Sequence, residues 1–131
     1  MDQRGVDPLG RPYDPVLLQR KPDVGPDGFF ALDLRVGRVA AASPSPNARR
    51  PAWLLDVDFG PVVGLLRTSA QVTNYSEEEL LGRLVVGVIN IGRRRVASID
   101  SEFLVLGALD PDGTVHLLEV PREVLVGSAV A

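Results

Sequence analysis

The sequence predicts an all-β domain, a five-stranded barrel with one short helix and extra strands near the C-terminus. Its apolar runs are short, rich in leucine or β-branched residues, and end at a polar residue, glycine or proline, as buried strands do. Only residues 76–81 combine the signals of a helix. This helix falls between the third and fourth strands, and that order of elements is the order of the OB-fold barrel.

The first two strands follow from alternating patterns. In residues 29–42, apolar and charged side chains alternate from Leu32 to Val36, as in a strand with one buried face. Gly37 then interrupts the alternation, and a glycine inside a long first strand predicts a bulge or a sharp bend. Residues 53–59 (WLLDVDF) form the second strand, with the apolar residues at odd positions on one face and two aspartates on the other.

Two connections flank the second strand. Residues 43–51 are dense in turn formers and carry Arg49 and Arg50, so we expect a loop between the first and second strands. Residues 60–61 (Gly-Pro) end the second strand. The third strand is predicted over residues 62–67 after a short hairpin turn.

The predicted helix has a clear beginning and end. Ser76 and Glu79 have the spacing of a capping box, and acidic residues fill the first turn. Gly82 follows the last helical residue, where glycine commonly closes a helix. We therefore expect one helix over residues 76–81, with its acidic face in solvent.

The remaining strands lie in the second half of the chain. Residues 84–90 form the fourth strand and residues 103–109 the fifth. Residues 110–113 (DPDG) are a turn, and residues 115–118 form a short strand that can pair back as a hairpin. Residues 124–131 are small and apolar, so we expect them to pack on the domain or on a second subunit.

A chain of 131 residues is long enough for one domain. Residues 1–28 hold five of the eleven prolines and few apolar residues, so they are expected to form a flexible or loosely docked extension. The alternative is a strap that packs on the domain through Tyr13 and residues 16–18. Residues 29–131 are assigned to the barrel domain.

Composition excludes several classes of site. The chain has no cysteine, so it has no disulfide and no thiolate metal site. No cofactor is expected, and a metal site at Asp110, Asp112 and His116 is disfavoured because DPDG is first a turn signature. No stretch approaches the roughly 20 apolar residues of a membrane span, and the N-terminus lacks a signal-peptide pattern. The expectation is a cytoplasmic protein without enzymatic activity and without a membrane partner.

The polar connection of residues 90–102 is the part of the sequence where binding chemistry is concentrated. Arg93–Arg95 is the one dense cationic cluster, and guanidinium groups match phosphate oxygens. Three adjacent arginines cannot all point one way on an extended segment, so about two would reach one ligand. The alternative is a solvated turn that protects a strand edge from aggregation. Because the net charge is −3, an anionic partner must be held by such a local patch.

Neighbouring polar residues allow two interpretations each. The Asn90 amide could contact a base edge or phosphate, or it could cap its own loop. Ser101 and Glu102 could hold the loop through local hydrogen bonds, with Glu102 paired to an arginine, or could contact the ligand. Aromatic side chains are few, and Phe59 and Phe103 are expected in the core, which counts against a general binder of single-stranded nucleic acid.

Five segments in order carry a family resemblance: LDLRVGRV (32–39), PNARRPA (46–52), DFG (58–60), SAQVT (69–73) and SEFLVLG (101–107). Together they resemble the tRNA-binding domain superfamily and, within it, the small stand-alone branch of CsaA export-related chaperones. A related domain is fused to methionyl-tRNA synthetases. The resemblance covers nearly the whole chain after the N-terminal extension.

This resemblance implies an OB-fold, a homodimer, no enzymatic activity and binding of tRNA through its structure. The CsaA branch also implies binding of unfolded or pre-secretory polypeptides, which is the alternative function. A third possibility is an assembly module that brings an aminoacylation partner to RNA. The RNA-contacting residues implied are those around the loop after the fourth strand and those of an R-x-S-x-Q pattern beside it: Asn90, Arg94, Arg95, Ser101, Glu102, Arg67, Ser69 and Gln71.

Two positions depart from the family pattern. Leu54 stands in the second strand where relatives often carry a lysine, and Ser98 stands where they nearly always carry a glycine. Asp100 also places a negative charge beside Ser101. These departures affect the strength of tRNA binding, and the apolar Leu54 favours a polypeptide ligand slightly.

Overall fold

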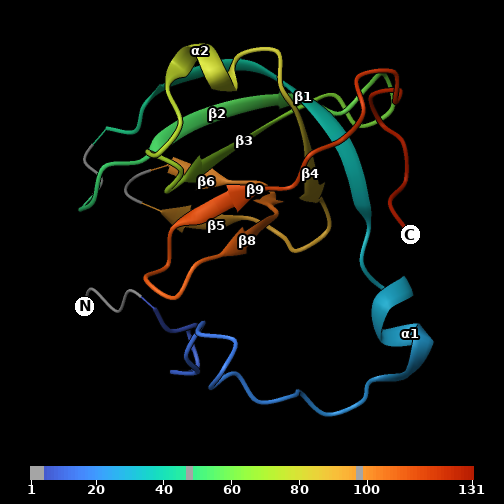
Figure 1. The fold of residues 1–131 in the computed structure, drawn as a ribbon. Helices are drawn as coiled ribbons and strands as arrows, with labels where there is room; N and C mark the ends of the chain where they lie inside the picture. The colour runs from blue at the N-terminus through green and yellow to red at the C-terminus, as the bar shows by residue number, and fades with distance from the viewer. Residues whose placement is uncertain (1–4, 47–48, 97–98) are drawn as a thin grey trace.

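The architecture is a curled antiparallel sheet that nearly closes into a barrel (Figure 1). A computed structural model describes residues 5–46, 49–96 and 99–131. The sheet has the order β3-β2-β1-β4-β7. Its strands are β1 (Leu34–Pro44), β2 (Trp53–Asp58), β3 (Leu65–Ala70), β4 (Leu84–Val88) and β7 (Leu104–Val105). The two outer strands approach each other where the Thr68 hydroxyl of β3 donates to the carbonyl oxygen of Phe103, at 3.0 Å. The predicted five-stranded barrel is therefore confirmed.

The barrel interior is built around an edge-to-face pair of aromatic rings. Phe59 and Phe103 are buried, as predicted, with ring centroids 5.0 Å apart. Two glycines make room for them. A Cβ at Gly37 would lie 2.8 Å from the Phe59 ring, and one at Gly87 would lie 2.9 Å from both rings. Gly37 therefore serves close packing, and the register shift of β1 lies a little later, between Val39 and Ala41.

A second apolar cluster lies on the outside of the barrel. Leu34, Val86 and Val88 are buried there, and residues of the C-terminal segment pack over them. The segment is hydrogen-bonded along β1: the Gly127 N–H donates to the Val36 carbonyl at 2.7 Å. Of the two predicted positions for residues 124–131, the structure shows packing on the chain's own domain. As a result β4 is buried along its whole length.

The connection after β4, which the sequence predicts to be a simple loop, contains a hairpin. β5 (Arg94–Val96) pairs with β6 (Ile99–Ser101) in antiparallel fashion. Arginines are poor indicators of a strand, and here cross-strand ion pairs such as Arg95 with Asp100 accompany the pairing. Ser98, one of the two departures from the family pattern, lies outside the described residues.

Further corrections concern the ends of strands. The predicted fifth strand is divided into β7 and β8 (Gly107–Leu109), and β8 forms the predicted hairpin with β9 (Val115–Leu117). The third strand begins later than predicted, because the turn extends to Gly64, whose N–H donates to the Gly60 carbonyl at 2.7 Å. Gly64 has a φ of +82°, which favours glycine.

The described residues contain two helices where one was predicted. The predicted helix is present as α2 (Glu77–Leu80), capped by a complete capping box between Ser76 and Glu79. The additional helix, α1 (Gly25–Phe30), was not predicted, because the sequence around it is rich in proline and glycine. No α1 residue is buried, and Figure 1 shows this helix beside the barrel, below the start of β1. Leu32 is also exposed, so the buried face of β1 begins at Leu34.

The described part of the N-terminal extension forms turns and one isolated β-bridge, between Val6 and Pro12. Its first turn lies against the β8–β9 turn, since a Cβ at Gly5 would be 2.5 Å from the Pro111 carbonyl oxygen. Residues 16–18 are exposed, whereas Tyr13 is half-buried. Neither α1 nor α2 has the length and apolar character that crossing a membrane requires.

Candidate functional site

A groove of about 520 Å³ lies between the outer face of β2 and β3 and the β5–β6 hairpin. It forms there because alternation in β2 and β3 turns one set of side chains inward to the core and the other set outward. Three arginines, three carboxylates and three apolar residues line what we call the arginine groove: Arg67, Arg93, Arg95, Asp56, Asp100, Glu102, Leu65, Leu66 and Ile99.

Each arginine of the groove faces a carboxylate. Arg67 makes a two-pronged contact with Asp56, with Nε 2.7 Å from Oδ1 and Nη2 3.1 Å from Oδ2. The hydrogen-bonded Asp56 carboxylate raises the pKa of the Arg67 guanidinium above its usual value. Arg93 lies 3.4 Å from Glu102, and Arg95 lies 3.2 Å from Asp100. The groove therefore holds three oriented guanidinium groups, and the charges of three carboxylates balance their positive charges.

The strand pairing separates the three adjacent arginines. Arg93 and Arg95 line the groove, whereas Arg94 is paired opposite Ser101 and is absent from the lining. Two of the three adjacent arginines therefore face the same groove, and the third does not. Arg94 was predicted as a site residue together with Arg95, and the structure brings only Arg95 into the groove.

Ser101 and Glu102 tie the hairpin to β3. The Ser101 side chain is 8% exposed, and its hydroxyl accepts a hydrogen bond from the Ser69 N–H at 3.1 Å. The Glu102 N–H donates to the Arg67 carbonyl at 2.8 Å, and the Arg67 N–H donates to Glu102 Oε1 at 3.1 Å. These contacts match the interpretation in which Ser101 and Glu102 support the loop through local hydrogen bonds. The expected pairing of Glu102 with an arginine is made with Arg93.

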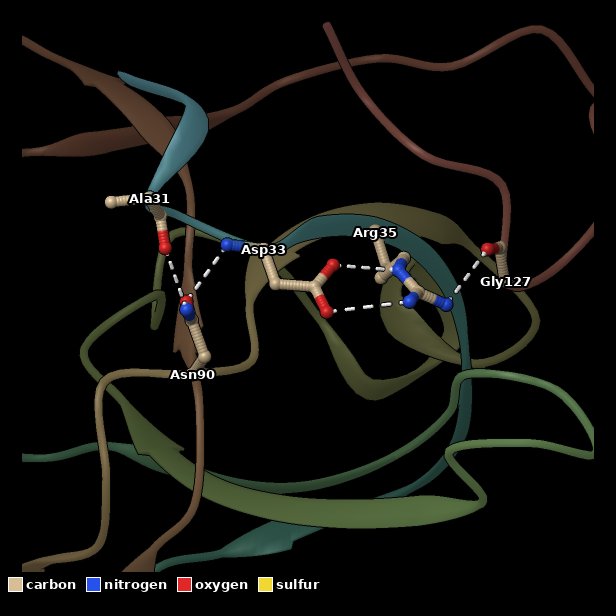
Figure 2. A network of polar contacts seen from close by, with 5 residues as sticks. All are labelled: Ala31, Asp33, Arg35, Asn90 and Gly127. Carbon is tan, nitrogen blue, oxygen red and sulfur yellow. Dashed lines mark hydrogen bonds and ion pairs between the residues drawn. The ribbon is translucent and has the colours of Figure 1, made fainter. Parts of the chain in front are cut away.

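Asn90 supports a different part of the fold (Figure 2). Its Nδ2 donates to the Ala31 carbonyl and its Oδ1 accepts from the Asp33 N–H, both at 2.8 Å. Asp33 in turn binds the Arg35 guanidinium, which donates to the Gly127 carbonyl at 3.4 Å. Both functional groups of the Asn90 amide thus hold the segment that leads into β1, and neither caps the loop of Asn90 itself.

The other two residues of the R-x-S-x-Q pattern do not line the groove. Ser69 is paired opposite Leu54 on the outer face of the sheet, and its hydroxyl is 3.1 Å from the Ser45 hydroxyl. Gln71 is exposed just after β3 and is absent from the groove lining. Of this pattern, Arg67 alone lines the arginine groove.

A second hollow, of about 470 Å³, lies at the loop between β1 and β2. Its lining is mostly apolar with two arginines, and we call it the tryptophan pocket: Pro44, Ser45, Arg49, Arg50, Pro51, Ala52, Trp53 and Thr73. The Trp53 indole N–H donates to the Tyr75 carbonyl at 3.0 Å, which holds the ring in place.

Sequence reasoning missed several residues of these hollows. It assigned no binding role to Asp56 or Asp100 in the groove, or to Arg49 in the pocket, and it considered Arg93 only as one of three adjacent arginines. The two-residue spacing of Arg93 and Arg95 was a usable signal, because alternate residues of a strand share a face. The carboxylates gave no such signal, since acidic residues on an outer strand face are ordinary.

His116, which the sequence offered as one member of a metal site, lies in β9 and faces Asp110, which follows β8. His116 Nε2 lies 2.7 Å from Asp110 Oδ2. In the part of the chain that the structure describes, no three histidine or acidic side chains are grouped to hold a metal ion.

Residues 34–129 match the family described as "Putative tRNA binding domain". The match spans the barrel, both hollows and the C-terminal segment. The chain belongs to this family.

Solved structures and curated proteins agree with this assignment. The chain is similar to the CsaA chaperone protein of Picrophilus torridus, with 36% identity, a TM-score of 0.78, and coverage of 83% of this chain and 100% of that one. It is similar to chaperone CsaA of Bacillus anthracis str. Ames, with 39% identity, a TM-score of 0.78, and coverage of 84% and 100%. A methionine–tRNA ligase of Pyrococcus abyssi is 35% identical over 127 residues, which is 93% of this chain and 17% of the ligase. The chain thus spans about one sixth of the length of the curated relatives it matches.

Proposed function

We propose that this chain is a non-catalytic tRNA-binding protein that holds folded RNA by its phosphates in the arginine groove. The observation that carries the proposal is the convergence of three guanidinium groups, from β3 and from the β5–β6 hairpin, on one groove. Guanidinium groups bind phosphate oxygens with two parallel hydrogen bonds. Membership of the tRNA-binding family supports the same ligand.

The groove favours recognition of RNA backbone and shape. Within the described chain no aromatic side chain lines it, so it offers no platform for stacking bases. The carboxylates keep Arg67, Arg93 and Arg95 oriented before the ligand arrives. A phosphate must then compete with these carboxylates, which keeps binding moderate and dependent on salt.

Binding of tRNA across a salt series, measured by fluorescence anisotropy, tests the proposal. Contacts to a few phosphates predict a log–log salt slope of roughly −2 to −4. Arg93→Ala/Arg95→Ala should weaken binding and reduce the slope by about one to two. Arg20→Ala/Arg122→Ala removes the same charge outside the groove and should change little. Equal effects of the two double mutants, or no binding at low salt, would contradict the proposal.

A single neutralising substitution tests the role of the carboxylates. Glu102→Gln keeps an oxygen that accepts the Arg67 N–H but removes the charge that competes with phosphate. We expect tighter tRNA binding and a salt slope steeper by about 0.7 to 0.9. Glu78→Gln, on the exposed face of α2, makes the same change of net charge and should leave affinity nearly unchanged. Unchanged or weaker binding by Glu102→Gln alone would show that phosphate does not displace this carboxylate.

The second candidate function is that of an export-related chaperone that holds unfolded or pre-secretory polypeptide. The balanced charges of the groove and the apolar Leu65, which is 63% exposed, favour it, and two similar structures are named as CsaA chaperones. Suppression of aggregation of an unfolded protein, measured by light scattering, would support this function. Binding of polypeptide should depend weakly on salt, whereas RNA binding should depend on it strongly.

We also propose that the protein is a homodimer. Phe29 and Phe30 of α1 contact each other edge to face and remain exposed, Phe30 by 73%. Large apolar side chains gathered on a surface commonly mark an interface. Two copies would present two arginine grooves to one tRNA, which raises affinity through effective concentration.

A further inference from the structure

The tryptophan pocket has the chemistry of a nucleotide subsite. Two rigid prolines, Pro44 and Pro51, and the Trp53 side chain give it apolar walls. The Trp53 indole N–H is already bonded to Tyr75, so the ring offers a surface for packing and no free donor. Arg49 lies in the lining and is exposed.

The charge of the pocket differs from that of the arginine groove. The groove lining has a carboxylate for each arginine, whereas the described lining of the tryptophan pocket carries the exposed Arg49 and contains no carboxylate. An apolar hollow with a positive rim suits a ligand that joins a flat, uncharged ring to an anion. An unpaired nucleotide has this chemistry, since its base has a π-face and its phosphate is negative.

The pocket is joined to the arginine groove through Ser69. The Ser69 hydroxyl is 3.1 Å from the hydroxyl of Ser45, which lines the pocket. The Ser69 N–H donates to Ser101, which anchors the hairpin that bears Arg93 and Arg95. Ser69 thus contacts both a residue that lines the tryptophan pocket and a residue that anchors the hairpin of the arginine groove. The two hollows are therefore neighbours, and a single RNA could reach both.

We propose that the tryptophan pocket takes one unpaired nucleotide of an RNA whose backbone lies in the arginine groove. The base packs against Trp53 and the prolines, and Arg49 binds its phosphate. This inference rests on the proposed tRNA-binding function and adds to it a requirement for an unpaired nucleotide, such as one from a loop or an end of the RNA.

Trp53 is the only tryptophan of the chain, so its fluorescence reports on this pocket. We expect tRNA to change Trp53 emission, after correction for RNA absorbance, along the same titration curve that anisotropy gives. A four-nucleotide single-stranded RNA should produce the same change more weakly, and a blunt-ended RNA duplex should not produce it.

Variants separate the pocket from the groove. Arg49→Ala should weaken tRNA binding about tenfold, because a charge-assisted contact to phosphate is lost. Arg122→Ala, an exposed arginine elsewhere, is the matched control and should have little effect. Thr73→Phe places a ring in the pocket from an exposed position and should abolish the fluorescence response to the four-nucleotide RNA. Circular dichroism confirms that each variant is folded.

The outcomes distinguish this inference from the proposed function. If tRNA binds with a normal anisotropy response while Trp53 emission and the Arg49→Ala affinity stay unchanged, the pocket proposal is overturned and tRNA binding stands. If the protein binds no tRNA at low salt, both are overturned. If an unfolded polypeptide changes Trp53 emission and RNA does not, the pocket belongs to a polypeptide ligand and the nucleotide proposal is wrong.

Discussion

At the scale of single residues, the groove depends on side chains that support others. The Ser101 hydroxyl is buried and accepts a backbone hydrogen bond of β3, and the Glu102 carboxylate does the same beside it. These two residues join the hairpin to the sheet that carries Arg67. The spacing of the arginines across the groove therefore depends partly on Ser101, which has little surface of its own for a ligand.

Ser101→Ala tests this supporting role. The substitution leaves the Ser69 N–H without its acceptor, so we expect the free energy of unfolding to fall by about 1 kcal/mol. Urea denaturation measures the change. Ser43→Ala, at an exposed position of β1, is the control and should be nearly neutral. A stability equal to that of the wild type would show that water or another group replaces the Ser101 hydroxyl.

At the scale of elements, two glycines of neighbouring strands shape the barrel interior. Gly37 of β1 and Gly87 of β4 leave the space that the Phe59 and Phe103 rings occupy. A strand glycine here is required by packing, since its φ is not in the left-handed region.

Gly87→Ala should therefore overpack the core. The added methyl group would lie 2.9 Å from both rings, which predicts a loss of about 1 to 3 kcal/mol in the free energy of unfolding. Combining it with Phe103→Leu should recover part of this loss relative to the sum of the single substitutions. Purely additive effects, measured by urea denaturation, would show that the clash is not between these two residues.

The capping box of α2 makes part of the stability dependent on pH. The backbone N–H of Ser76 donates to the Glu79 carboxylate, and this bond lowers the pKa of Glu79 below its usual value. A carboxylate whose pKa is lower in the folded state stabilises the fold above the pKa of an unfolded glutamate. That contribution is lost as the pH falls through the lower, folded pKa.

Glu79→Ala should therefore be less stable than the wild type near neutral pH and should approach it in acid. Urea denaturation at about pH 7 and about pH 3 measures the two differences. Glu78→Ala removes the same charge from the same helix turn and serves as the control. A Glu79→Ala deficit that stays constant with pH would contradict the capping contribution.

At the scale of the whole molecule, three segments that lie far apart in the sequence meet at the start of β1. The Asn90 amide holds residues 31 and 33, and Arg35 binds the Gly127 carbonyl (Figure 2). The C-terminal segment covers the outside of the barrel, and α1 lies beside it without burying any residue. The two phenylalanines of α1 remain exposed there, and they form the surface at which we propose that a second copy binds.

Phe29→Ser/Phe30→Ser should convert a dimer into a monomer. Sedimentation velocity of the full chain measures the state, and tRNA affinity should fall together with dimerisation. Val16→Ser/Leu17→Ser replaces two exposed apolar residues of the N-terminal extension by serine and should leave the dimer intact. A wild-type protein that remains monomeric at high concentration would overturn the dimer proposal.

The sequence by itself determined the class of fold and most of its elements. The alternation of residues 53–59, the capping box at Ser76 and the DPDG turn are local patterns, and local sequence contains the information that defines them. The family resemblance also followed from sequence alone, because its segments occur in order along the chain.

Only the tertiary structure decided which polar groups meet. Arg67 and Asp56 lie on paired strands, and Arg93 and Glu102 meet because they flank the paired strands of the β5–β6 hairpin. The roles of Asn90, of the C-terminal segment and of the tryptophan pocket likewise depend on contacts between residues far apart in the chain. The physical reason is that a side chain's partners are set by strand register and packing, which no short stretch of sequence specifies.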